Sequence, residues 1–149
     1  MAIDPIHGHW QVYYLGERVL VVKGWGTWNV AAATGFAADA RATIDALKSP
    51  WAILADYRDF EAAVLDAEPI ISGLHRYGLE RGCAFVAELR GRSTLGELQR
   101  REMHVAHPSA ASESFSDPPE AVAWLREQGF ELSLERVREL LDVPPPRRR

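Results

Sequence analysis

The stretch Trp51-Ala-Ile-Leu-Ala-Asp56 decides the fold of this chain. It is short, continuously apolar and ends in a carboxylate, which is the pattern of a strand buried on both faces of a parallel sheet. The residues on either side of it follow a helical period. We therefore expect a central strand of an α/β sheet. The polar run Asp56-Tyr-Arg-Asp59 should follow that strand, at the edge where such sheets place their binding sites.

Two strands and a helix precede the strand from Trp51 to Asp56. The aromatic and β-branched runs from His9 to Leu15 and from Arg18 to Trp25 are separated by Gly16-Glu17, which predicts an antiparallel hairpin. Asn29 can cap the helix that follows, and Ser49-Pro50 ends it. Its apolar face repeats at the helical period through Ala33, Phe36, Ala37, Ala40, Ile44 and Leu47.

Two further helix and strand pairs come after the central strand. A helix should begin near Asp66 to Pro69 and stop at Gly82, and Cys83 to Leu89 should form the fourth strand. The capping box Thr94-x-x-Glu97 predicts a third helix. This helix has only a thin apolar stripe, made of Leu95, Leu98 and Val105.

The chain closes with two helices. Ser114 to Ser116 reads as a brief edge strand, and Asp117-Pro-Pro-Glu120 is a strong helix start. Gly129-Phe130 ends that helix with a Schellman turn, and residues 133–141 add a short amphipathic helix. The order β-β-α-β-α-β-α-β-α predicts a mixed, mostly parallel sheet with flanking helices.

Composition sets further limits. The 149 residues, 47% of them hydrophobic, fit one domain over residues 1–143, with its core at about 9–130 and a solvated Pro/Arg tail at 144–149. The net charge of −4 argues against a nucleic-acid partner. Cys83 lies in an apolar run and reads as a buried thiol. Because no signal peptide opens the chain, we expect a cytoplasmic protein.

The element order and three segments resemble the SpoIIAA-like proteins, single-domain bacterial relatives of STAS domains that are also compared with the SEC14 lipid-transfer fold. The segments are Trp51 to Asp56, Arg81 to Ala87 and Phe115 to Leu125. The resemblance covers roughly His9 to Phe130 and rests on apolar patterns.

This resemblance implies a non-enzymatic binding module with no cofactor. Its partner would be another protein or a small hydrophobic, lipid-like ligand; a homodimer and association with a membrane surface both fit the expectation. In STAS antagonists of anti-sigma factors, a serine at the start of the second helix is phosphorylated. Here Ala67 stands in that slot, so the phosphoserine switch should be lost.

The run Gly24-Trp-Gly-Thr-Trp-Asn29 stands between the second strand and the first helix. A dinucleotide loop would have a third glycine where Asn29 stands, so we expect a tight structural turn instead. Trp25 and Trp28 beside this turn can wall an apolar pocket, but core packing is the role that we favour for them.

The acidic run offers a different class of function. Asp56, Asp59 and Glu61 could serve a small enzyme if they converged with His75 in one pocket. Arg58 favours a salt-bridged structure instead, with recognition of a ligand or partner as the second reading. The pairs His7-x-His9 and His104-x-x-His107 have metal-like spacings, but no cysteine joins them and we expect no metal site.

The third helix is the expected place of ligand entry. Because its apolar stripe is thin, we expect Leu95 to Val105 to move as a lid over an apolar cavity. Leu95 and Leu98 would then contact the ligand or a partner. Arg100 and Arg101 would be available for an acidic head group or a membrane surface.

Overall fold

The computed structural model describes residues 5–106 and 110–145. Five strands form one sheet in the order β1-β2-β3-β4-β5, with β1 antiparallel to β2 and all other neighbours parallel. The strands are β1 His9–Leu15, β2 Val19–Trp28, β3 Trp51–Ala63, β4 Cys83–Leu89 and β5 Ala111–Phe115. The predicted mixed, mostly parallel sheet is confirmed.

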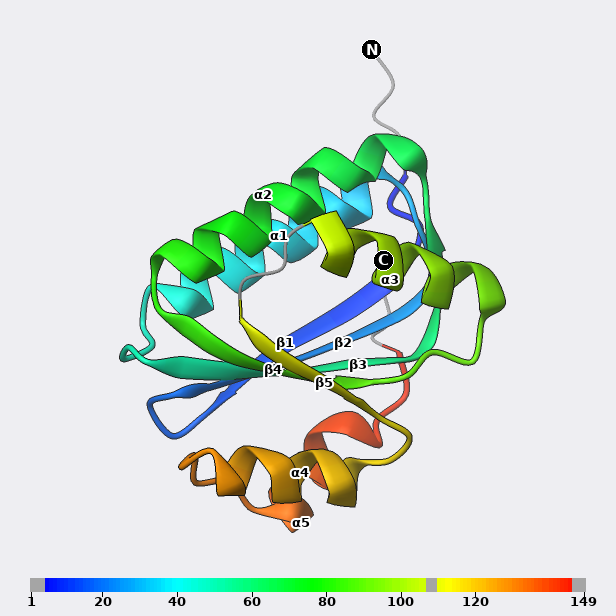
Figure 1. Ribbon diagram of the computed structural model, residues 1–149. Coiled ribbons are helices and arrows are strands. Elements are labelled where there is room, and N and C mark those ends of the chain that lie inside the picture. The colour runs from blue at the N-terminus through cyan, green and yellow to red at the C-terminus, as the bar shows by residue number, and fades with distance from the viewer. Residues whose placement is uncertain (1–4, 107–109, 146–149) are drawn as a thin grey trace.

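Helices cover both faces of the sheet (Figure 1). The helices α1 Val30–Ile44, α2 Glu68–Glu80 and α3 Thr94–Ala106 connect the parallel strands and lie on one face. The helices α4 Pro118–Glu127 and α5 Leu134–Leu141 lie on the other, and the short 3-10 helix η1 Leu65–Ala67 precedes α2. None of the described helices is long and apolar enough to cross a membrane.

The core has a separate layer on each side of the sheet, because strand side chains alternate between faces. Toward α4 and α5, the strands contribute Val19, Val21, Ala52, Leu54, Ala87 and Leu89. Toward α1 and α2, they contribute Leu20, Val22, Trp51 and Ala55. β3 therefore supplies both layers, as expected of a central strand.

The helix ends follow the sequence signals closely. The Asn29 side chain accepts a hydrogen bond from the Ala32 N–H, and Gly82 follows α2 with a φ of 97°. Asp117 caps α4, and the Phe130 N–H donates to the Leu125 carbonyl, as the Schellman turn predicts.

Three strands are longer than we predicted: β5 begins at Ala111 and not at Ser114, and the extensions of β2 and β3 correct the expected junctions. β2 continues through Trp28 and β3 through Ala63, so neither the run from residue 24 to 28 nor the acidic run at 56–61 is a loop. The two strands stay paired across two register shifts. Gly24 makes room for this path, because a Cβ there would lie 2.7 Å from the Trp28 indole.

The start of α3 also differs from the prediction. Ser93 caps this helix in place of Thr94, since its Oγ accepts from the Gly96 N–H at 3.2 Å. Leu95 and Leu98 are 54% and 52% exposed, so the predicted apolar stripe does not face the sheet. The side chains of residues 103–106, and all of residues 107–109 and 146–149, lie outside the described part; this includes Val105, both histidines of His104-x-x-His107 and most of the tail.

Candidate functional site

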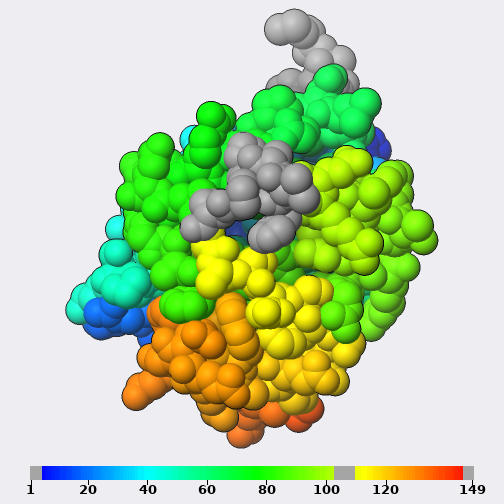
Figure 2. All heavy atoms as spheres, viewed as in Figure 1, coloured from blue at the N-terminus to red at the C-terminus, as the bar shows by residue number. Residues whose placement is uncertain are grey.

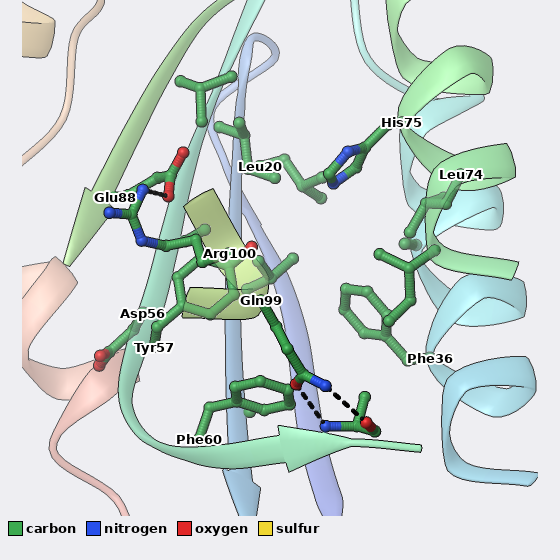
Figure 3. Close-up of a pocket in the computed structure, with 18 of the residues that line it drawn as sticks. Leu20, Phe36, Asp56, Tyr57, Phe60, Leu74, His75, Glu88, Gln99 and Arg100 are labelled. Atoms are coloured by element: carbon green, nitrogen blue, oxygen red, sulfur yellow. Dashed lines mark hydrogen bonds and ion pairs between the residues drawn. The ribbon is translucent and has the colours of Figure 1, made fainter. Parts of the chain in front are cut away.

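A cavity of about 440 Å³ lies between the sheet and the helices α1, α2 and α3. Figure 3 shows Tyr57 and Glu88 on the sheet side of this space and Leu74 and His75 on α2 opposite them. The walls are mostly apolar and include Leu20, Val22, Phe36, Ile53, Leu74 and Val86. Sites for small molecules have this size and this composition.

The position of α3 leaves the space unfilled. α3 lies over the carboxyl end of β3, where the Gln99 amide donates to the Ala63 carbonyl and accepts from the Ala63 N–H, both at 2.9 Å. A Cβ on Gly96 would lie 2.7 Å from the Glu61 carbonyl oxygen, so helix and strand are in close contact there. Consequently α3 does not cover β4, and Val86 stays partly exposed at the floor of the cavity.

The exposed and half-exposed polar residues of the lining come mainly from α2 and α3. Residues Glu68 and His75 of α2, Glu102 of α3 and Ala110 before β5 all line the cavity. Figure 2 shows the green α2 and the yellow-green α3 on opposite sides of this face, with the yellow β5 below them. Polar side chains therefore lie at the rim of the cavity and apolar side chains inside it.

One end of the cavity is charged. The Arg100 guanidinium donates to Glu88 at 2.6 Å and, through Nε, to Glu97 at 2.9 Å. Burial alone would lower the pKa of Arg100, but the two carboxylates hold it above its usual value. Burial would raise the pKa of Glu97, but hydrogen bonds from Arg100 and from the Gly91 N–H hold it below its usual range. Arg100 and Glu97 are therefore both ionised at neutral pH.

Two other ionisable groups of the wall stay neutral. Burial, together with the Glu88 charge, raises the pKa of the Tyr57 phenol, so it keeps its proton. Burial raises the pKa of the Cys83 thiol to about 12, so this thiol keeps its proton at neutral pH.

A second charged cluster lies on the opposite face of the sheet. The Lys23 ammonium donates to Asp56 at 2.8 Å and to Asp59 at 2.9 Å, and Arg58 donates to both oxygens of Asp56. Burial alone would raise the pKa of Asp56, but hydrogen bonds from Arg58 and Lys23 hold it below its usual value. Arg58 also lies 3.9 Å from Asp142, just after α5. These charges neutralise one another within the protein, as the salt-bridged reading predicted.

The enzyme alternative loses its geometric basis. It required Asp56, Asp59, Glu61 and His75 to converge, but the two aspartates bind Lys23 on the α5 side of the sheet and Glu61 accepts from Thr27. His75 lines the cavity on the other side. Within the described ranges, no group of three or more His, Cys, Asp or Glu side chains is placed to hold a metal ion.

The two tryptophans Trp25 and Trp28 lie on opposite faces of the sheet. Trp28 lines the cavity, is 4% exposed and packs against Phe36 and Phe60, so it serves the core and the pocket wall together. Trp25 is on the opposite face, where the Lys23 ammonium lies 5.1 Å from its ring centre. It does not wall the pocket.

The residues expected on the third helix also separate. Leu95, Leu98 and Arg101 are exposed and do not line the cavity. Arg100 does line it, but its side chain is only 11% exposed and is held by two carboxylates. The expectation that Arg100 is free for an external acidic head group is therefore wrong. Ala67, in the expected phosphoacceptor slot, is fully buried.

Sequence reasoning missed several cavity residues, chiefly Tyr57, Glu88 and Gln99. One of them carried a readable signal. Glu88 is the single acid in the apolar strand Cys83–Leu89, and a buried carboxylate in such a strand needs partners or a function. The polar run around Tyr57 predicts a loop. In the structure Tyr57 lies on β3 and faces the same side of the sheet as Ile53 and Ala55.

Comparisons with solved structures show what the fold is similar to. An uncharacterised protein of the DUF3478 family with a SpoIIAA-like fold, from Shewanella loihica, matches with a TM-score of 0.61 and 19% identity, over 84% of this chain and 98% of that one. The unphosphorylated anti-sigma factor antagonist SpoIIAA matches with a TM-score of 0.54 and 14% identity, over 81% of this chain and 99% of that one.

The phosphorylated form of SpoIIAA, a Bacillus cell fate determinant, gives a TM-score of 0.57 at 12% identity, over 78% of this chain and 99% of that one. No protein-family model and no curated protein matches the chain. The chain has a SpoIIAA-like fold, and at these identities the comparisons carry the fold alone.

Proposed function

We propose that this protein is a non-enzymatic binding module of the SpoIIAA/STAS-like type that holds a small apolar ligand between its sheet and helices α2 and α3. The observation that carries the proposal is the cavity of about 440 Å³ with its apolar walls. An interior space as large as this cavity is normally filled by side chains, because protein interiors pack as densely as organic crystals. An unfilled apolar space is therefore a cost in stability that a ligand would offset.

The absence of a hydroxyl in the phosphoacceptor slot supports a function other than the phosphoserine switch. Ala67 contributes a buried methyl group to the cluster around Trp28 and Ile71. A phosphate there would need both a hydroxyl and access to solvent, and the position offers neither.

A partner protein is the second candidate, and a separate surface favours it. Leu95 and Leu98 are half exposed on the outer face of α3 and do not line the cavity. Adjacent exposed leucines on one helix face can form part of a contact surface. This candidate differs from the first because it needs the outer face of α3 and not the cavity.

A neutral apolar dye separates the two candidates. We expect Nile red to bind with one-to-one stoichiometry, with a change in tryptophan emission because Trp28 and Trp51 line the cavity. Val86→Phe should abolish binding by filling the floor, whereas Leu98→Ser should retain it. Binding lost in Leu98→Ser and kept in Val86→Phe would place the dye on the outer surface and contradict the proposal.

A further inference from the structure

The charged end of the cavity carries information about the ligand's head group. Glu88 lines the cavity on the same strand as Val86, and its side chain is only 7% exposed. One oxygen accepts from Arg100 at 2.6 Å and the other accepts a long hydrogen bond of 3.3 Å from Ser112. A carboxylate has about four acceptor sites, so Glu88 retains capacity for another donor.

The Arg100 guanidinium is already shared between two internal carboxylates. Nε and Nη2 both donate to Glu97, and Nη1 donates to Glu88. These bonds use three of its five N–H groups. A ligand carboxylate that accepted the remaining two would lie beside Glu88 and Glu97, and the repulsion between like charges would oppose its binding.

The charge of the whole lining points the same way. Lys23 and Asp56 point to the opposite face of the sheet, so the charged side chains toward α2 and α3 among the described lining residues are Glu68, Glu88 and Glu102, against Arg100 and His75. The formal charge of this lining is negative, and Glu97 beside Arg100 adds another negative charge. A buried like charge costs several kcal/mol.

We infer that the cavity selects apolar molecules whose head group donates hydrogen bonds, namely amines and alcohols, and that it rejects carboxylates such as fatty acids. The inference rests on the proposed function, because it names the ligand class of the same site. The donor group binds Glu88, and the apolar tail lies along Val86 and Ile53 toward Leu74. A cationic amine gains most, since it also offsets the negative lining.

Three probes with the same tail test this inference. Decylamine, decanol and decanoic acid, each below its aggregation threshold at neutral pH, are titrated against the Nile red complex. We expect decylamine and decanol to displace the dye. Decanoate should have an affinity lower by a factor of about ten or more. In Glu88→Gln, the affinity for decylamine should fall and the affinity for decanoate should rise, while the affinity for decanol should change little. Glu113→Gln, an exposed position on β5 outside the cavity, is the matched control and should leave the order unchanged.

The outcomes separate the inference from the proposal beneath it. Decanoate binding as tightly as decylamine to the wild-type protein would overturn the inference and leave the cavity as a binding site. An unchanged order in Glu88→Gln would also overturn it. If Nile red and all three probes fail to bind, the proposed function itself fails. If Glu88→Gln does not fold, the order of the three probes on the wild-type protein still decides.

Discussion

Replacing Val86 by phenylalanine should make the protein more stable, although it enlarges a core residue. Val86 stands on β4, is only partly buried and faces the cavity. Phenylalanine adds four carbon atoms, and at about 0.8 kcal/mol per buried carbon the gain is at most about 3 kcal/mol. Imperfect fit and lost side-chain freedom reduce this, so we expect the free energy of unfolding to rise by about 1 kcal/mol.

Val21→Phe is the matched control, since it is the same change on the opposite face of the sheet. Val21 is fully buried in the layer under α4 and α5. Overpacking should lower the free energy of unfolding there by about 1 to 3 kcal/mol. Both variants are measured by urea unfolding followed by tryptophan fluorescence. Equal destabilisation of the two would mean that the space beside Val86 is already filled, and the reasoning would be refuted.

Three further outcomes follow from named contacts. Asp56→Asn should lower the free energy of unfolding by about 3 kcal/mol at neutral pH, because it leaves a buried lysine with one carboxylate fewer. The pKa of Asp56 is lower in the folded than in the unfolded protein. The stabilisation by Asp56 is therefore complete above its unfolded pKa of about 3.9 and is lost as the pH falls through the folded value. Asp56→Asn should consequently show a shallower acid transition in a pH series. Gln99→Leu should cost about 1 to 3 kcal/mol and accelerate hydrogen exchange in α3, since it removes both bonds to Ala63; unchanged exchange would show that other contacts hold the helix. Leu125→Ala should lower the free energy of unfolding by about 2 to 5 kcal/mol. Trp124→Ala should cost less than the full loss of a core aromatic, because Trp124 is only partly buried. A full loss in chemical denaturation would place Trp124 deeper in the core.

The sequence signals were most reliable where a local rule has one structural solution. The bounds of β1 and β4 were predicted correctly from their apolar runs, and Asn29, Gly82 and Asp117 mark helix ends in the structure as they do in the sequence. Each of these residues meets a geometric need of its own immediate neighbours. No long-range contact is required to read them.

The errors came from long-range pairing and from the space between elements. The run from Asp56 to Glu61 is polar and reads as a loop, but pairing with β2 keeps it extended. The thin stripe on α3 predicted a weakly anchored helix, and nothing in the sequence indicated that a glutamine amide and a close glycine contact join that helix to β3. A cavity is set by where helices sit relative to the sheet, and periodicity within one element does not contain that distance.

Native mass spectrometry of the freshly purified protein tests the central claim most directly. The account predicts that a fraction of the protein carries one small molecule, or takes up one equivalent of decylamine when purified empty, and that Val86→Phe carries none. The bound mass should leave the protein on collisional activation as a single species. Wild-type protein that stays bare after incubation with decylamine, decanol and Nile red would contradict the claim that the space between the sheet, α2 and α3 is a ligand site.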